Sequence, residues 1–196
     1  AKEVLKVKLN QSIYVTLTDH INFAIQRQKE GVRLKNALLW EIKEFYRNEY
    51  QIGQYAIELL NEKIKTDFTE DEAGFIALHI VNAEYNTSIH NTFAMTNMIQ
   101  ELLQFIQKEM GRRYNENSIH YERYLAHLKF LARRVCDHNL LPDDDMEFAA
   151  RIEQKYPAEY ECSRKAADYI KMQYHENLSE EEILYLLKGS KKIWNL

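Results

Sequence analysis

The feature that most constrains the fold of this chain is an internal repeat. The segments TEDE at residues 69–72 and SEEE at residues 179–182 lie 110 residues apart, and each resembles a capping box that opens a helix. An offset of 107 residues places HINF at residues 20–23 on HLKF at residues 127–130. Self-similarity at a fixed offset is the signature of a structural unit that occurs more than once. The sequence therefore predicts two homologous domains in tandem.

The two offsets and the polar segments indicate where these domains lie. The difference between the offsets predicts a short loop insertion in the second copy, near residues 141–145. A polar stretch at residues 86–91 follows the last helix of the first copy and is the expected boundary. We expect one domain over residues 1–88 and the other over residues 92–196. Residues 1–9 look like the tail of a helix, so the first domain is expected to be truncated at its N-terminus.

Each copy has the composition and spacing of helices. Only 5 Gly and 2 Pro occur among the 196 residues, whereas ordinary usage of about 7% and about 5% would give roughly 24 in total. From Ile13 to Gln28 the apolar residues recur on one helical face, and Gly31 follows. The predicted helices cover about residues 12–28, one after Asn36 to Phe45, one through Tyr55–Leu60, one from Thr69, and then 92–111, 117–138, 146–155, 157–175 and 179–188. The predicted fold class is all-α, with two tandem helical bundles.

Charge and hydrophobicity exclude two classes of partner. Lys and Arg number 26 against 30 Asp and Glu, which gives a net charge of -4. A nucleic-acid-binding domain normally carries a basic excess, so we expect no RNA contact from these residues. No apolar run approaches the roughly 20 residues of a membrane span, so we expect no membrane insertion. Cys136 and Cys162 match no metal motif, and reduced thiols in the cytoplasm are the expectation.

The seven histidines are the residues most able to carry chemistry. None has a Glu three residues before it or a second His four residues after it, so the helical spacings of metal ligands are absent. The sequence also has no phosphate-binding loop and no nucleophile motif. It therefore predicts no enzyme, no catalytic residue, no metal and no cofactor.

Three histidines stand out by their position. His20 and His127 occupy equivalent places in the repeat, on apolar helix faces, and His79 lies inside the run FIALHIV. Each is either an ordinary packed side chain or an acceptor of phosphate. Neutral imidazole is a good nucleophile toward a phosphoryl donor, since its ordinary pKa is about 6.5. Phosphorylation would add roughly two negative charges, enough to remake a packed interface.

Three segments carry a family resemblance. TDHINFAI at residues 18–25 and DEAGFIALHIVNAE at residues 71–84 are similar to the two histidine signatures of the PTS-regulation domain, and HLKF at residues 127–130 resembles the start of a second copy. The likeness is to the LicT/BglG/SacY family of transcriptional antiterminators and extends over essentially the whole chain. It implies helical bundles that form a homodimer and that the sugar phosphotransferase system phosphorylates on histidine.

The resemblance also implies roles for these histidines. His20 and His79 would form an inhibitory site, phosphorylated by a sugar-specific enzyme II when the inducing sugar is absent. His127 would be an activating site, phosphorylated by HPr when preferred sugars are scarce. In that family an RNA-binding module precedes these domains, and nothing here resembles it. The expected function is the regulatory part of a sugar-operon antiterminator; a phosphohistidine carrier and an inert helical dimerisation module are the alternatives.

The second copy departs from the family pattern at its end. Gly189 stands at the position equivalent to His79, and the surrounding LKGSKK has no apolar continuation. Glycine within a helix costs about 1 kcal/mol relative to alanine. We therefore expect the last helix to fray or turn near Lys188, and His127 to be the single phosphoryl acceptor of the second domain. The residues expected to pack loosely beyond this point are Ile193, Trp194 and Leu196.

Overall fold

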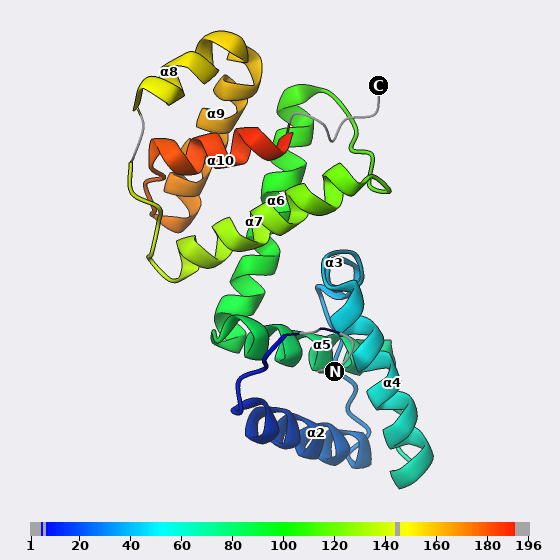
Figure 1. Ribbon diagram of the computed structural model, residues 1–196. Coiled ribbons are helices and arrows are strands. Elements are labelled where there is room, and N and C mark those ends of the chain that lie inside the picture. The colour runs from blue at the N-terminus through cyan, green and yellow to red at the C-terminus, as the bar shows by residue number, and fades with distance from the viewer. Residues whose placement is uncertain (1–4, 6, 144–145, 191–196) are drawn as a thin grey trace. The chain divides into compact units, whose positions relative to one another are not determined.

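The chain folds into helices that form two units. The computed structural model describes residues 5, 7–143 and 146–190, except for the side chains of residues 146–149 and 188–190 (Figure 1). Within these residues the regular structure is nine helices and no strand. The units are Ala1–Thr96 and Asn97–Leu196, and each is compact. The predicted all-α class is confirmed for the described part of the chain.

The first unit is built around one buried helix, α5 (Glu70–Tyr85), which is visible near its centre in Figure 1. It contacts α2 (Ile13–Lys29), α3 (Leu39–Phe45) and α4 (Arg47–Ile64). An α-helix that is apolar on nearly every side is typical of a helix enclosed by others. The small and apolar residues of α5 that are buried in this way are Ala73, Gly74, Ile76, Ala77, Leu78, Ile80, Val81 and Ala83.

Helices α4 and α5 approach each other closely at Gly53. A Cβ atom at this position would overlap the carbonyl oxygen of Ala73 and would lie 3.1 Å from its carbonyl carbon. The neighbour is backbone, which cannot move aside as the end of a flexible side chain can. The packing of α4 on α5 therefore requires glycine at this position.

Replacing Gly53 with Ala is expected to lower the free energy of unfolding of the first unit by about 1–3 kcal/mol, the usual cost of overpacking. This loss should occur although Ala favours a helix over Gly by about 1 kcal/mol. Gln54→Ala, at an exposed position of the same helix, is the matched control and should stay within about 0.5 kcal/mol of the parent. Amide hydrogen exchange of α4 and α5 measures both variants. Equal protection in the two would contradict the close approach.

The second unit repeats this plan around its last helix. It contains the later part of α6 (Ile89–Met110), α7 (Ile119–Cys136), α8 (Met146–Lys155), α9 (Pro157–Tyr174) and α10 (Glu180–Ser190). Helix α10 contacts α7, α8 and α9, as α5 contacts its neighbours in the first unit. The buried apolar residues of α10 are Ile183, Leu184, Leu186 and Leu187.

The observed helices agree with the predicted ones to within a few residues at most of their ends. Helix α10 continues through Gly189 to Ser190, two residues beyond the predicted end, and the expected fraying near Lys188 stays a prediction. The penalty of one glycine, about 1 kcal/mol, is small beside the burial of the apolar residues that hold α10. The predicted loose packing of the last apolar residues concerns Ile193, Trp194 and Leu196, which lie outside the described residues.

Candidate functional site

The two histidines predicted to share a site in the first unit lie next to each other. His20 is on α2 and His79 is on α5, and the centroids of their rings are 4.9 Å apart at an interplanar angle of 47°. Phe75, one turn before His79, lies 5.7 Å from the ring of His20. Both histidines are half-buried. Their predicted proximity is confirmed.

A buried carboxylate links His20 to a cation. Oε2 of Glu72 lies 2.9 Å from Nε2 of His20, and Oε1 accepts a hydrogen bond of 3.1 Å from Arg27. Burial by itself would raise the pKa of the Glu72 carboxyl, but the hydrogen bonds and charges of His20 and Arg27 outweigh burial. The pKa therefore lies below its ordinary value, and Glu72 is an ionised hydrogen-bond acceptor at neutral pH.

His79 is held in its neutral form. Burial, reinforced by the neighbouring His20, lowers the pKa of His79 to about 4. Its Nδ1 atom is buried, and no described residue offers it a hydrogen bond. A neutral imidazole keeps a lone pair on one ring nitrogen, which can attack an electrophile such as a phosphoryl group. The first site thus supports nucleophilic chemistry at nitrogen.

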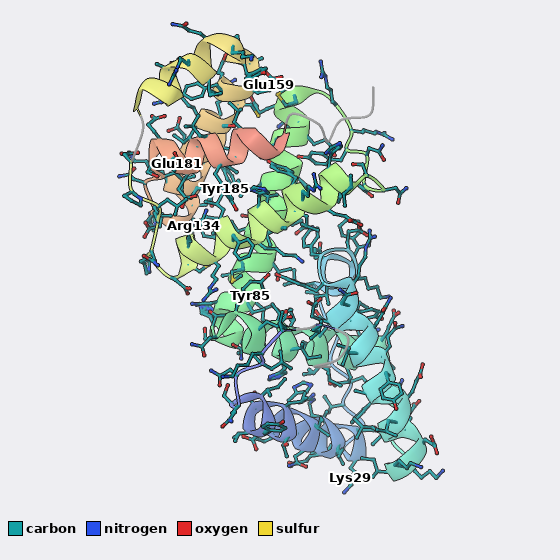
Figure 2. The ribbon with its side chains drawn as sticks, viewed as in Figure 1. Lys29, Tyr85, Arg134, Glu159, Glu181 and Tyr185 are labelled. Atoms are coloured by element: carbon teal, nitrogen blue, oxygen red, sulfur yellow. The ribbon has the colours of Figure 1, made fainter. Side chains whose placement is uncertain are left out.

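The second unit carries a related but different arrangement around His127. His127 lies on α7, half-buried, with its ring centroid 4.3 Å from that of Tyr185 on α10. The guanidinium of Arg134 lies over the same Tyr185 ring, 4.9 Å from its centroid (Figure 2). Both carboxylate oxygens of Glu182 accept hydrogen bonds of 2.6 Å from Arg134, and Oε1 also accepts one from the backbone N–H of Leu141.

The two glutamates were expected to cap helices, and this prediction needs correction. In the first unit the Thr69 side chain makes no capping hydrogen bond, and the carboxylate of Glu72 faces His20 and Arg27 instead. In the second, the hydroxyl of Ser179 does accept a hydrogen bond of 3.2 Å from the N–H of Glu182, but the Glu182 carboxylate binds elsewhere. The side chains of Arg27 and Arg134 compete successfully with the backbone N–H groups at the helix start for these carboxylates, because hydrogen bonds between charged groups are the stronger ones.

The ion pairs were missed by the sequence reasoning, although the repeat contains their signal. Arg27 and Arg134 are separated by the same 107 residues as His20 and His127, and Glu72 and Glu182 by the same 110 as the two capping segments. Extending both offsets to every charged residue would have aligned Arg27 with Arg134 and Glu72 with Glu182, and so marked one basic and one acidic position that occur in both copies.

The remaining histidines lie outside this arrangement. His90, His138 and His175 are exposed, His120 is half-buried, and His175 is the left-handed residue that ends α9. Among the described residues, no group of three or more His, Cys, Asp or Glu is placed to hold a metal ion. No helix in the same part of the chain is both long and apolar enough to cross a membrane.

Comparison with known proteins agrees with these observations. The PRD domain matches residues 1–83 and 100–188. The chain is 45% identical to the transcription antiterminator LicT of Bacillus subtilis over 186 residues, which is 95% of this chain and 67% of that protein. It is 37% identical to a beta-glucoside operon antiterminator of Dickeya chrysanthemi, over 95% of this chain and 66% of that protein.

A third relative is protein GlcT of Staphylococcus aureus, which is 33% identical over 90% of this chain and 62% of its own length. The chain thus spans about two thirds of the length of these relatives. The PRD match occurs twice and covers most of both structural units. The chain therefore belongs to the PRD domain family, together with the antiterminators that it resembles.

Proposed function

We propose that this chain is the regulatory part of a sugar-operon transcriptional antiterminator that works in the cytoplasm. The phosphotransferase system phosphorylates its histidines, and phosphorylation controls dimerisation and thereby RNA antitermination by an N-terminal RNA-binding module outside this chain. The observation that carries the proposal is the contact between His20 and His79 in a chain of this family. Relatives named as antiterminators support a regulatory rather than an enzymatic role.

The three histidines have different proposed donors. A sugar-specific enzyme II phosphorylates His20 and His79, which inhibits, and HPr phosphorylates His127, which activates. The different surroundings of the histidines support this division. His20 contacts a second histidine and Glu72, whereas His127 contacts Tyr185.

The regulatory form is proposed to be a homodimer that associates through the histidine faces. Helix α2 carries His20 and exposes three large apolar side chains, Tyr14 at 66%, Val15 at 64% and Phe23 at 62%. Large apolar side chains exposed on the helix that carries His20 support association with a partner there. Phosphorylation of His20 places about two negative charges beside this helix. In a twofold dimer the same charges come from both copies, and their repulsion opens the interface.

Phosphorylation tests the proposal directly. Incubation of the full chain with phosphoenolpyruvate, enzyme I and HPr is expected to label His127, and addition of a sugar-specific enzyme II is expected to label His20 and His79. Acid-labile phosphate and intact mass measure the label. Replacing each histidine with Ala should remove its own label, whereas His90→Ala, at an exposed position, should leave the labelling unchanged.

Light scattering on the same samples measures dimerisation. Phosphorylation by the enzyme II should shift the chain toward monomer, Asp at position 20 or 79 should do so partly, and Ala should block the response. No label on any histidine would favour the inert dimerisation module. Repeated transfer of the phosphoryl group from this chain to another acceptor protein would favour the phosphohistidine carrier. A monomer in every phosphorylation state would contradict the dimer.

A further inference from the structure

The carboxylate of Glu72 makes one ring nitrogen of His20 different from the other. Nε2 of His20 lies 2.9 Å from this carboxylate, and Nδ1 makes no hydrogen bond to any described residue. The side chains of His20, Glu72 and Arg27 are only 15%, 12% and 23% exposed, so water competes weakly for these contacts. Because Arg27 donates a hydrogen bond to Oε1 of Glu72, both oxygens of the carboxylate have a partner.

An ionised carboxylate can only accept hydrogen bonds. A contact of 2.9 Å between its oxygen and Nε2 is therefore favourable only when Nε2 carries the proton. Neutral imidazole has one N–H, so protonation of Nε2 leaves the lone pair on Nδ1. The hydrogen bond of one ring nitrogen thus decides which of the two nitrogens is the nucleophile.

We propose that Glu72 is a positioning residue that holds His20 in the Nε2–H tautomer, so that Nδ1 is the atom at which His20 accepts phosphate. This inference rests on the proposed function and names the reacting atom of that site. The lone pair on Nδ1 attacks the phosphorus of a phosphorylated donor protein, and the Nδ1–P bond forms. The bond between phosphorus and the donor breaks, and its electron pair leaves with the donor. The proton stays on Nε2, where Glu72 balances the positive charge that develops on the ring.

His79 should differ from His20 in the atom that reacts. Its Nδ1 is buried, and a phosphoryl group on this atom would have to displace the packed residues around it. The nitrogen left to His79 is Nε2. The two neighbouring histidines are therefore expected to form different isomers, the Nδ1 isomer at His20 and the Nε2 isomer at His79.

The tautomer can be measured without any phosphoryl donor. We would record the ring ¹⁵N signals of the full, histidine-labelled chain at about pH 8.5, well above the ordinary histidine pKa of about 6.5. The His20 signals are assigned by their loss in His20→Ala. The expected spectrum has Nε2 protonated and Nδ1 unprotonated. A His20 ring with its proton on Nδ1 would overturn the proposal, whatever the behaviour of any variant.

Glu72→Gln tests the cause of this preference. The amide can either accept from or donate to Nε2, so both tautomers find a partner, and the preference should fall by about tenfold, as loss of a charged hydrogen bond implies. Glu72→Asp should restore part of it. Glu70→Gln is the matched control, because Glu70 lies on the same helix, is exposed and binds Lys43 instead. An unchanged tautomer ratio in a folded Glu72→Gln chain would overturn the role of Glu72.

The isomer is then identified after phosphorylation with phosphoramidate, a small donor that needs no partner protein. Phosphohistidine with phosphorus on Nδ1 at His20 is the expected product, and phosphorus on Nε2 would overturn the assignment. A chain that phosphoramidate modifies at Nδ1 but that enzyme II and HPr leave unlabelled would support this inference and contradict the proposed function. A failure of the Nδ1 assignment and a failure of the proposed function therefore give different experimental results.

Discussion

Replacing Arg134 with Ala is expected to lower the free energy of unfolding of the second unit by about 3–5 kcal/mol, the cost of removing one partner of a buried ion pair. The side chain of Glu182 is 0% exposed, and both of its oxygens accept hydrogen bonds from Arg134. Without the guanidinium, one N–H from Leu141 remains for a buried carboxylate. Because the chain has two units, site-resolved amide hydrogen exchange of α7 and α10 is the appropriate measurement.

Arg133→Ala is the matched control for this substitution. Arg133 is the neighbouring residue on α7, is 38% exposed, and pairs with Asp137 one turn away at 3.4 Å. Such exposed pairs are worth about 0–1 kcal/mol. The double variant Arg134→Met, Glu182→Leu should regain most of the loss, since apolar side chains can replace a buried pair. An equal loss of unfolding free energy in Arg134→Ala and Arg133→Ala would show that the buried Glu182 carboxylate does not need Arg134 for its stability.

Most of the fold could be predicted because helix periodicity and helix-breaking residues act locally. The stripe that ends before Gly31 is an example, since α2 ends at Lys29 and Gly31 takes a left-handed conformation with φ of 73°. At two other helix ends the sequence has no glycine. Lys65 ends α4 and His175 ends α9, both in the left-handed conformation that usually favours glycine. Neither position is a glycine, so the residue type gives no sign of a left-handed end, although the predicted end of α9 near residue 175 agrees with the observed one.

The site could be predicted in part, for a similar reason. The repeat and the resemblance identified His20 and His79, and the structure brings their rings together. The local pattern around Glu72 predicted a helix cap, but its carboxylate instead meets His20 and Arg27 from another helix. A capping box is a local motif, whereas an ion pair between helices depends on how they pack. Side chains whose partners lie far away in sequence are those that local patterns misplace.

The short distance between His20 and His79 limits how much phosphate their site can hold. The ring centroids are 4.9 Å apart, and each phosphohistidine would carry about two negative charges at neutral pH. Two such groups roughly 5 to 9 Å apart repel by about 2–3 kcal/mol even at the dielectric constant of water. A partly buried site screens charge less than water does. Addition of a second phosphoryl group to the pair is therefore expected to be disfavoured by at least about 30- to 150-fold relative to the first.

Intact mass spectrometry can test this limit in a chain whose other five histidines are replaced by Asn. His20→Ala and His79→Ala in this background should each accept one phosphoryl group. The chain with both histidines should accept one readily and a second only at far higher donor concentration, and lower ionic strength should strengthen the effect because salt screens exposed charges. A doubly phosphorylated fraction equal to the product of the two single occupancies would show that the sites do not interact. Since the rings are in contact, independent behaviour would require the side chains to separate on phosphorylation, and a changed ring contact in the singly phosphorylated chain would reveal that movement.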